Sequence, residues 1–161
     1  SVKPGQSMEF GLGIIGAGRD ENDTNPFGAV AKFGYKFITS PDWYDRRQRY
    51  AHILKGSYIK PEVTFLHYKS DYYWVDYIGG NDTYKIVKEK ANTTMFSVML
   101  VGGKQWVFND LFLVDLFAGI GYGFGHNPLN ESWHYGFLGA DNDTPLTLTA
   151  GIKIGFLLGK K

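Results

Sequence analysis

Apolar residues occupy every second position over long stretches of this chain, and glycine fills many of the positions between them. The clearest stretch runs from Leu111 to Gly125, where Gly119, Gly121 and Gly123 alternate with apolar side chains. A period of two is that of a β-strand, and glycine at this density disfavours a helix. No run of about 18 apolar residues interrupts the pattern, so the sequence excludes a transmembrane helix.

Five further stretches show the same alternation. They cover residues 7–18, 27–38, 57–68, 94–108 and 145–158. Strands of soluble proteins average about five or six residues, whereas a tilted membrane-spanning strand needs about 9–11. These stretches have the longer length, and turn residues separate them. The sequence therefore predicts an all-β, antiparallel up-and-down arrangement of at least six strands.

The two faces of the predicted strands differ in kind. One face is apolar and aromatic, while the other carries Gly, Ser, Thr and isolated charges. A face in contact with water is normally rich in Lys, Glu, Thr and Gln, whereas glycine suits a narrow interior where backbones approach closely. We therefore expect the apolar face to meet lipid and the small polar face to fill a lumen. The prediction is a single transmembrane β-barrel domain over residues 1–161.

Charged residues on the predicted inner face are nearly balanced, with four lysines against three carboxylates. An unpaired buried charge costs several kcal/mol, so these groups are expected to form an ion-pair network that plugs the lumen. The alternative is that some of them lie at water-exposed strand ends. The residues are Glu9, Lys32, Lys36, Lys60, Glu62, Asp115 and Lys153.

The connections agree with a membrane topology. The long segments 69–93 and 126–144 fall on one side of the barrel and the tight turn 109–110 on the other, an asymmetry typical of outer-membrane barrels. The exception is 39–56, where capping residues and helical spacing predict a short helix at about 41–54. Pro61 cannot donate to a ladder, so a bulge or a local break is expected near it.

The strand count is eight or six. Residues 71–78 and 83–90 flank Gly79-Gly80-Asn81-Asp82, which is a good hairpin turn. We expect these segments to be an additional strand pair, giving eight strands, because bacterial barrels usually have eight or more. The alternative is that they extend the flanking strands as a hairpin that protrudes above the membrane.

Three segments resemble small outer-membrane β-barrel proteins of Bacteroidota-type bacteria. The stretch from Leu54 to Val63 is similar to a segment of that family, Asp115 to Phe124 is similar to its penultimate strand, and Ala150 to Phe156 to its final strand. The chain departs from the family pattern at its end, where Leu157-Leu158-Gly159-Lys160-Lys161 follows Phe156. The resemblance implies a bacterial outer-membrane location and no catalytic residues.

The sequence gives little indication of catalysis or metal binding. The chain has no cysteine, and none of its four histidines forms a close metal-binding pair. The acidic segments 20–23 and 141–143 match no calcium loop and are expected to be solvated. A net charge of +1 gives no electrostatic case for nucleic acid. We therefore predict no cofactor, no metal and no nucleic-acid partner.

Aromatic residues gather in two of the predicted loops. They are expected either to anchor the barrel at the membrane interface or to form a contact surface for a protein or a glycan. The residues of this possible contact surface are Tyr72, Tyr73, Trp74, Tyr77, Tyr84, Trp133, Tyr135 and Phe137.

The predicted function is that of a non-enzymatic outer-membrane barrel, a structural or accessory subunit beside a larger outer-membrane complex and in contact with outer-membrane lipid. One alternative is a soluble lipocalin-like carrier of an apolar ligand, with the apolar face inward. The other is a lipid-modifying barrel enzyme that uses Ser132 or His134. No secretory signal is visible at Ser1 to Gln6, so we expect either a mature chain or one that is never exported.

Overall fold

The structure is a computed structural model that describes residues 5–16, 25–41, 54–77, 84–109, 111–130, 133–140 and 143–156, the side chains of residues 40–41, 74–77, 84–86 and 133 excepted. This part of the chain forms β-strands and contains no helix. The strands are β1 (Gln6–Ile15), β2 (Phe27–Pro41), β3 (Gly56–Tyr77), β4 (Tyr84–Phe108), β5 (Phe112–His126), β6 (Trp133–His134), β7 (Phe137–Gly139) and β8 (Leu146–Phe156).

All strands belong to one antiparallel sheet in the order β1-β2-β3-β4-β5-β8-β7-β6. The six long strands are neighbours in chain order, as in a meander, and the short β6–β7 hairpin pairs with the beginning of β8. The all-β, antiparallel prediction is confirmed. The six predicted stretches coincide with the long strands except at their ends.

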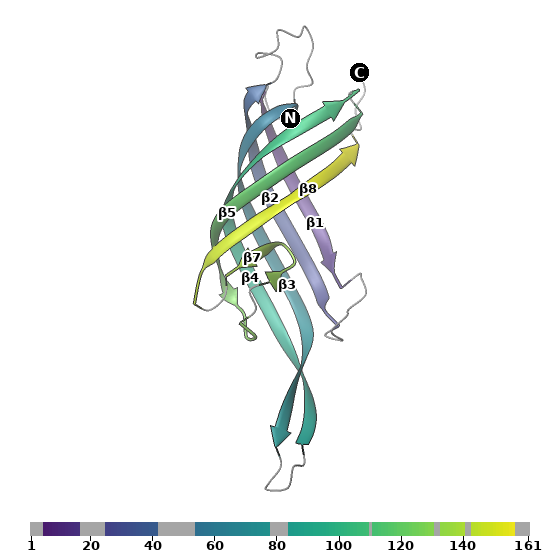
Figure 1. The fold of residues 1–161 in the computed structure, drawn as a ribbon, viewed down its shortest axis with the longest axis vertical. Coiled ribbons are helices and arrows are strands. Elements are labelled where there is room, and N and C mark those ends of the chain that lie inside the picture. Colours follow the sequence, from purple (N-terminus) through teal and green to yellow (C-terminus); the bar gives the residue numbers. More distant parts are fainter. Residues whose placement is uncertain are drawn as a thin grey trace.

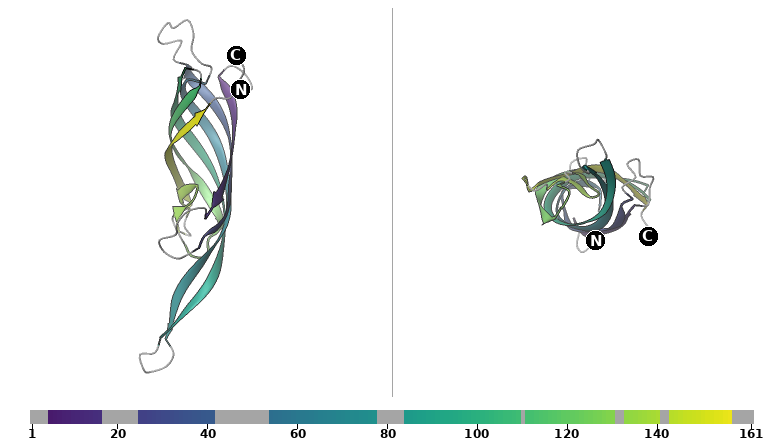
Figure 2. Two further views of the ribbon diagram at one scale, coloured as in Figure 1. Left: turned by 90° about the vertical axis from the view of Figure 1, so that its right-hand side faces the viewer. Right: turned by 90° about the horizontal axis from the view of Figure 1, so that it is seen from below.

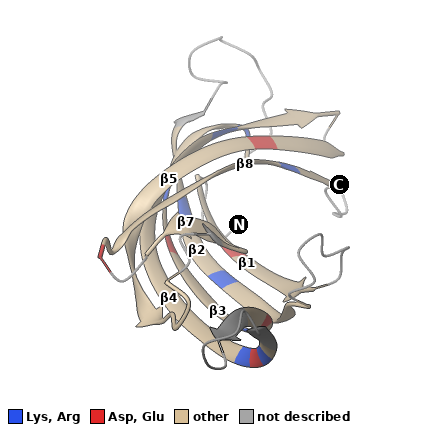
Figure 3. Cartoon of the chain, turned by 60° about the horizontal axis from the view of Figure 1, so that its bottom comes forward, with Lys and Arg blue, Asp and Glu red and all other residues tan. Residues whose placement is uncertain are grey.

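The sheet curls around a central space, and its first and last long strands face one another (Figures 1 and 2). Within the described ranges, β1 is an edge strand that pairs with β2 alone, and β8 pairs with β5 and, near its start, with β7. No ladder joins β1 to β8 among the described residues. The sheet is therefore strongly curved but not closed, as Figure 3 shows.

The two faces of the curled sheet have opposite chemistry. Apolar side chains point outward and are exposed, for example Leu12 and Ile14 on β1 and Ile152 on β8, which are 76%, 76% and 68% exposed. The concave face carries buried charged side chains, including Lys60 and Asp115. The alternation predicted from the sequence therefore has the expected sidedness, with the apolar face on the outside.

The additional strand pair predicted at 71–78 and 83–90 is wrong. β3 and β4 pair without a break from Gly56↔Gln105 to Tyr77↔Tyr84, so these residues extend two existing strands. β2 pairs with β3 only as far as Lys69, and β5 pairs with β4 only from Thr94. Residues 70–77 and 84–91 therefore form a two-stranded ribbon that projects beyond the sheet (Figure 1).

Two smaller predictions have mixed outcomes. The helix at about 41–54 falls mainly on residues 42–53, which lie outside the described residues; Pro41 ends β2 and Leu54 is in a turn. The β2–β3 register is the same on both sides of Pro61, although the ladder is interrupted there, where Tyr35 lies opposite Pro61 and Lys36 opposite Lys60. The bulge lies a few residues further along, between Ile38 and Ser40.

The β6–β7 hairpin folds against the concave face at the ribbon end of the sheet. Its Phe137 is 3% exposed and packs in a cluster that fills this end. The cluster consists of Ile15, Leu66, Tyr68, Met95, Met99, Val101, Phe137 and Ala140. The concave face thus has an apolar end closed by the hairpin and, beyond it, a charged section.

Candidate functional site: a buried ion-pair network

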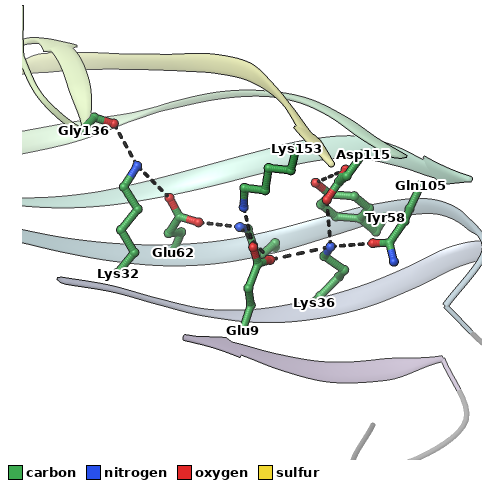
Figure 4. Close-up of polar contacts among 10 residues, drawn as sticks. Glu9, Lys32, Lys36, Tyr58, Glu62, Gln105, Asp115, Gly136 and Lys153 are labelled. Atoms are coloured by element: carbon green, nitrogen blue, oxygen red, sulfur yellow. Dashed lines mark hydrogen bonds and ion pairs between the residues drawn. The ribbon is translucent and has the colours of Figure 1, made fainter. Parts of the chain in front are cut away.

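Glu9 of β1 is the centre of the charged section. Its carboxylate accepts hydrogen bonds from Lys60 Nζ of β3, at 3.1 Å, and from Lys153 Nζ of β8, and it lies 3.6 Å from Lys36 Nζ of β2 (Figure 4). The Lys153 ammonium also lies 4.8 Å from the centroid of the Phe117 ring. One carboxylate therefore joins lysines from three other strands.

Asp115 of β5 forms a second centre nearby. Its Oδ2 accepts from Lys36 Nζ at 3.1 Å, and its Oδ1 accepts from the Tyr58 hydroxyl at 2.8 Å. Lys36 also donates to Gln105 Oε1 at 2.7 Å, and its Nζ lies 4.0 Å from the centroid of the Tyr58 ring. The Asp115 and Lys36 side chains are 2% and 7% exposed, so this pair is shielded from water.

Glu62 of β3 completes the network toward the hairpin. It accepts from Lys60 Nζ, and its Oε1 lies 4.0 Å from Lys32 Nζ. Lys32 also donates to the Gly136 carbonyl oxygen at 3.0 Å. The network therefore reaches from the β1–β8 edge to the turn of the β6–β7 hairpin, and Lys32 ties that hairpin to the sheet (Figure 4).

Glycine makes room for these long side chains. A Cβ on Gly34 would lie 2.7 Å from Lys60 Cδ, and one on Gly103 would lie 2.5 Å from the Tyr58 hydroxyl oxygen. Both distances are shorter than side-chain contacts allow, so a larger residue at either position would displace a member of the network. Crowding by the network therefore accounts for glycine at these two positions of the inner face.

The structure brings all seven predicted inner-face residues into this one network: Glu9, Lys32, Lys36, Lys60, Glu62, Asp115 and Lys153. No family model, curated protein or solved structure matches this chain. Charge counting missed Tyr58 and Gln105, which complete the Asp115 centre although they are uncharged. Their positions in the alternation do place them on the inner face, so the period of two contained the signal.

The predicted aromatic contact surface separates into different environments. Tyr72 and Tyr73 lie in the ribbon, where Tyr72 donates to Glu89 and Lys88 Nζ lies 5.5 Å from the Tyr73 ring centroid. Tyr135 is 44% exposed beside Tyr68. The inclusion of Phe137 is wrong because its ring is buried in the hairpin cluster. The side chains of Trp74, Tyr77, Tyr84 and Trp133 lie outside the described residues.

Charged groups of the ribbon lie outside the curled sheet. Asp71 accepts from Lys88 at 2.8 Å, and this hydrogen bond lowers the pKa of the Asp71 carboxyl and raises the pKa of the Lys88 ammonium. The hydrogen bond from Tyr72 to Glu89 raises the pKa of the Tyr72 hydroxyl. These side-chain contacts join the two strands of the ribbon where β2 and β5 no longer pair with them.

His134 of β6 is buried against Tyr68, whose hydroxyl lies 3.4 Å from His134 Nδ1. Burial lowers the pKa of this histidine, which favours the neutral ring. Ser132, the other residue of the enzyme alternative, lies outside the described residues. Within the described ranges no group of three His, Asp or Glu side chains could hold a metal ion. No described helix is long and apolar enough to span a membrane.

Proposed function

We propose that this chain is a small non-enzymatic β-barrel of a bacterial outer membrane, an accessory subunit of a larger membrane complex with a lumen that does not conduct ions. The observation that carries the proposal is the sidedness of the curled sheet. Large apolar side chains are exposed over the convex face of all six long strands, while lysines and carboxylates are buried on the concave face. Soluble monomers rarely expose contiguous apolar patches larger than a few hundred Å².

The ion-pair network supports the closed lumen. Its side chains cross the interior from β1, β2, β3, β5 and β8, and the hairpin fills the ribbon end. A conducting pore has a polar interior filled with water, whereas here lysine and carboxylate side chains occupy the interior in contact with one another. The same arrangement disfavours the soluble lipocalin-like alternative, because such a carrier needs an apolar inner surface.

A barrel in a bilayer also needs a closed sheet, because unpaired backbone groups in hydrocarbon cost several kcal/mol each. Five successive antiparallel pairings lead from β1 to β8 across the sheet. Because the number of pairings is odd, these two strands run in opposite directions. The contact between Glu9 and Lys153 already links them through their side chains. We propose that the membrane-embedded barrel closes by antiparallel pairing along this β1–β8 edge.

The ribbon supports the accessory role. A two-stranded ribbon is marginally stable alone in water, yet this one projects beyond every other strand and carries Tyr72 and Tyr73. Exposed aromatic side chains frequently dominate binding at protein interfaces. The ribbon is therefore the surface proposed to contact the larger partner.

The first experiment asks whether the protein behaves as an integral barrel. Cell envelopes are washed with carbonate at high pH and then extracted with detergent, and the extract is run on a gel with and without boiling. We expect release only by detergent and a change of migration on boiling, as for a closed barrel. Release by carbonate, or a monomer that stays soluble without detergent, would overturn the proposal.

The second experiment tests the accessory role. The tagged protein is purified in mild detergent as the wild type, as Tyr73→Ala in the ribbon and as Tyr122→Ala on the convex face, a matched loss of an exposed ring. We expect a larger outer-membrane protein to copurify with the wild type and with Tyr122→Ala and to be lost with Tyr73→Ala. Equal recovery in all three samples, or no partner in any, contradicts the accessory role.

A further inference from the structure

The convex face contains a groove along β2 near the ribbon end of the sheet. Its floor consists of Ala29 and Ala31, the small residues of a row that is otherwise aromatic. Phe27, which precedes them on the same face, lines the ribbon end of the groove. The groove has a volume of about 1220 Å³.

The walls follow from the strand register. Ala31 lies between Leu12 of β1 and Phe65 of β3, and Ala29 lies between Ile14 and His67 in the same way. Leu12, Ile14 and Phe65 are all exposed at the groove. A long, narrow apolar chain fits this shape better than a globular ligand does, because two rows of large side chains enclose a single row of small ones.

The polar side chains among the lining residues are His67 and Lys69, which lie toward the ribbon end of the groove. Lys69 pairs with Phe27 in the register and is exposed, and His67 beside it bonds Thr94 Oγ1 through Nδ1 at 2.7 Å. This is the level at which β1 ends and β2 begins, so it is the boundary of the apolar face. A ligand in the groove would therefore have its polar end at Lys69.

The charge at this boundary is positive. Successive pairs on this side of β3 and β4 are Lys69↔Asn92, Asp71↔Lys90 and Tyr73↔Lys88. Three lysines thus lie beside one carboxylate, and the Asp71 carboxylate is already bonded to Lys88. Lys69 and Lys90 are exposed. Basic groups at the edge of an apolar face are the usual recognition elements for anionic lipid headgroups.

We propose that the groove over Ala29 and Ala31 holds one acyl chain of an anionic membrane lipid, whose phosphate headgroup is bound by Lys69. The inference rests on the proposed membrane function and adds to it a site of defined chemistry. The proposed lipid remains bound to the protein, whereas the bulk lipid that covers the rest of the convex face exchanges freely. The apolar floor accounts for binding of the acyl chain, and Lys69 accounts for the preference for an anionic headgroup.

Native mass spectrometry of the full chain in detergent micelles tests the site, with phosphatidylglycerol and phosphatidylcholine of identical acyl chains as probes. The expected result is one retained lipid, with phosphatidylglycerol favoured roughly fivefold, as a single lysine at a membrane surface would give. Lys69→Gln removes the preference, and the matched control Lys104→Gln, at the opposite end of the convex face, keeps it. Equal retention of the two lipids by the wild type overturns the proposal.

Two further variants test whether the acyl chain lies in the groove. Ala31→Leu fills the floor and is expected to reduce retention of both lipids, whereas Ala118→Leu, an exposed alanine on the same face of β5, leaves retention unchanged. Equal effects of the two variants overturn the groove. Loss of a dimer peak in Ala31→Leu alone also overturns it, in favour of a second copy of the chain as the occupant.

The two proposals fail in different ways. If the protein is soluble without detergent, the membrane function fails and the lipid site fails with it. If the protein requires detergent and changes migration on boiling but retains no lipid selectively, only the lipid site fails. Gel migration of each variant before and after boiling shows that it has folded, and Lys69→Gln changes only an exposed side chain.

Discussion

Lys153 of β8 donates a hydrogen bond to Glu9 of β1, although these two strands share no backbone ladder in the described sheet. The two residues are 144 positions apart in the chain. Glu9 contacts Lys36 and Lys60 as well, so the carboxylate that links the two edges of the sheet also organises the interior. Its removal therefore affects more than one pair.

The first prediction concerns Glu9→Gln, which leaves three lysines without their shared carboxylate. We expect the free energy of unfolding to fall by about 2 kcal/mol, less than for a fully buried pair because the Glu9 side chain is 31% exposed. Urea denaturation in micelles, followed by gel migration, measures the change. Lys90→Gln on the exposed ribbon is the control and should change stability by less than about 0.5 kcal/mol.

The Glu9→Gln/Lys153→Gln double variant tests the link between the edges. Neutralising Lys153 as well removes one of the uncompensated charges, so the double variant is expected to lose less stability than the sum of the two single variants. A coupling between about 0.5 and 3 kcal/mol is typical of contacting residues. Additive losses would show that the side chains of β1 and β8 do not interact.

The second prediction compares two glycines of the inner face. A Cβ on Gly121 would lie 2.2 Å from the Val98 carbonyl oxygen of the adjacent strand, whereas a Cβ on Gly155 meets nothing within 4 Å. Gly121→Ala is expected to lose about 2 kcal/mol or to fail to fold, because backbone must move. Gly155→Ala should be neutral or stabilising by up to about 1 kcal/mol. The same urea titration measures both, and equal effects would contradict the close packing of β4 and β5.

The third prediction is a pH dependence from His134. Because burial lowers its pKa, the folded protein binds fewer protons there than the unfolded chain does at mildly acidic pH. Stability from this group is therefore present above the ordinary histidine pKa of about 6.5 and is lost as the pH falls below that value, until the folded group is protonated too.

Other groups also respond to acidification, so the contribution of His134 is measured as a difference between the wild type and a variant. The free energy of unfolding is measured at pH 8 and pH 5 for the wild type and for His134→Asn. We expect a smaller loss between the two pH values in the variant. An identical loss in both proteins would mean that His134 is as easily protonated in the folded protein as in the unfolded chain.

The fourth prediction concerns the ribbon. The Lys88 hydrogen bond holds the pKa of the Asp71 carboxyl below its ordinary value, so Lys88→Gln should raise that pKa toward about 3.9. NMR titration of the aspartate carboxyl carbons measures it, with Lys104→Gln as a control that should leave Asp71 unchanged. A pKa that does not move in Lys88→Gln would contradict the observed pairing of the ribbon.

The strands and their faces could be predicted from the sequence because alternation is a local property of the chain. In β1, Leu12 lies at an even position and Glu9 at an odd one. This difference alone places Leu12 on the convex face and Glu9 on the concave face. The same rule assigned all seven charged residues of the network to the inner face. It also placed Tyr58 and Gln105 there, but counting charges gave no reason to select them.

The ribbon and the buried hairpin could not be predicted in this way. A turn at residues 79–82 joins two strands equally well whether they are new spanning strands or extensions of existing ones, and only the registers with β2 and β5 distinguish the two cases. Phe137 and His134 belong to the segment 126–144, whose composition predicts a surface loop. Their burial depends on Lys32 and Tyr68, which lie far away in the sequence.

The order of strands in the sheet has a consequence for how the chain folds. Each long strand pairs with the next long strand along the chain, so hairpins can form one after another from short-range contacts. The Glu9–Lys153 contact differs from these hairpin contacts, because it requires the two ends of the meander to meet. We therefore expect docking of the first strand against the last to be the slow final event, with an open edge in earlier intermediates that is available for wrong pairing with another chain.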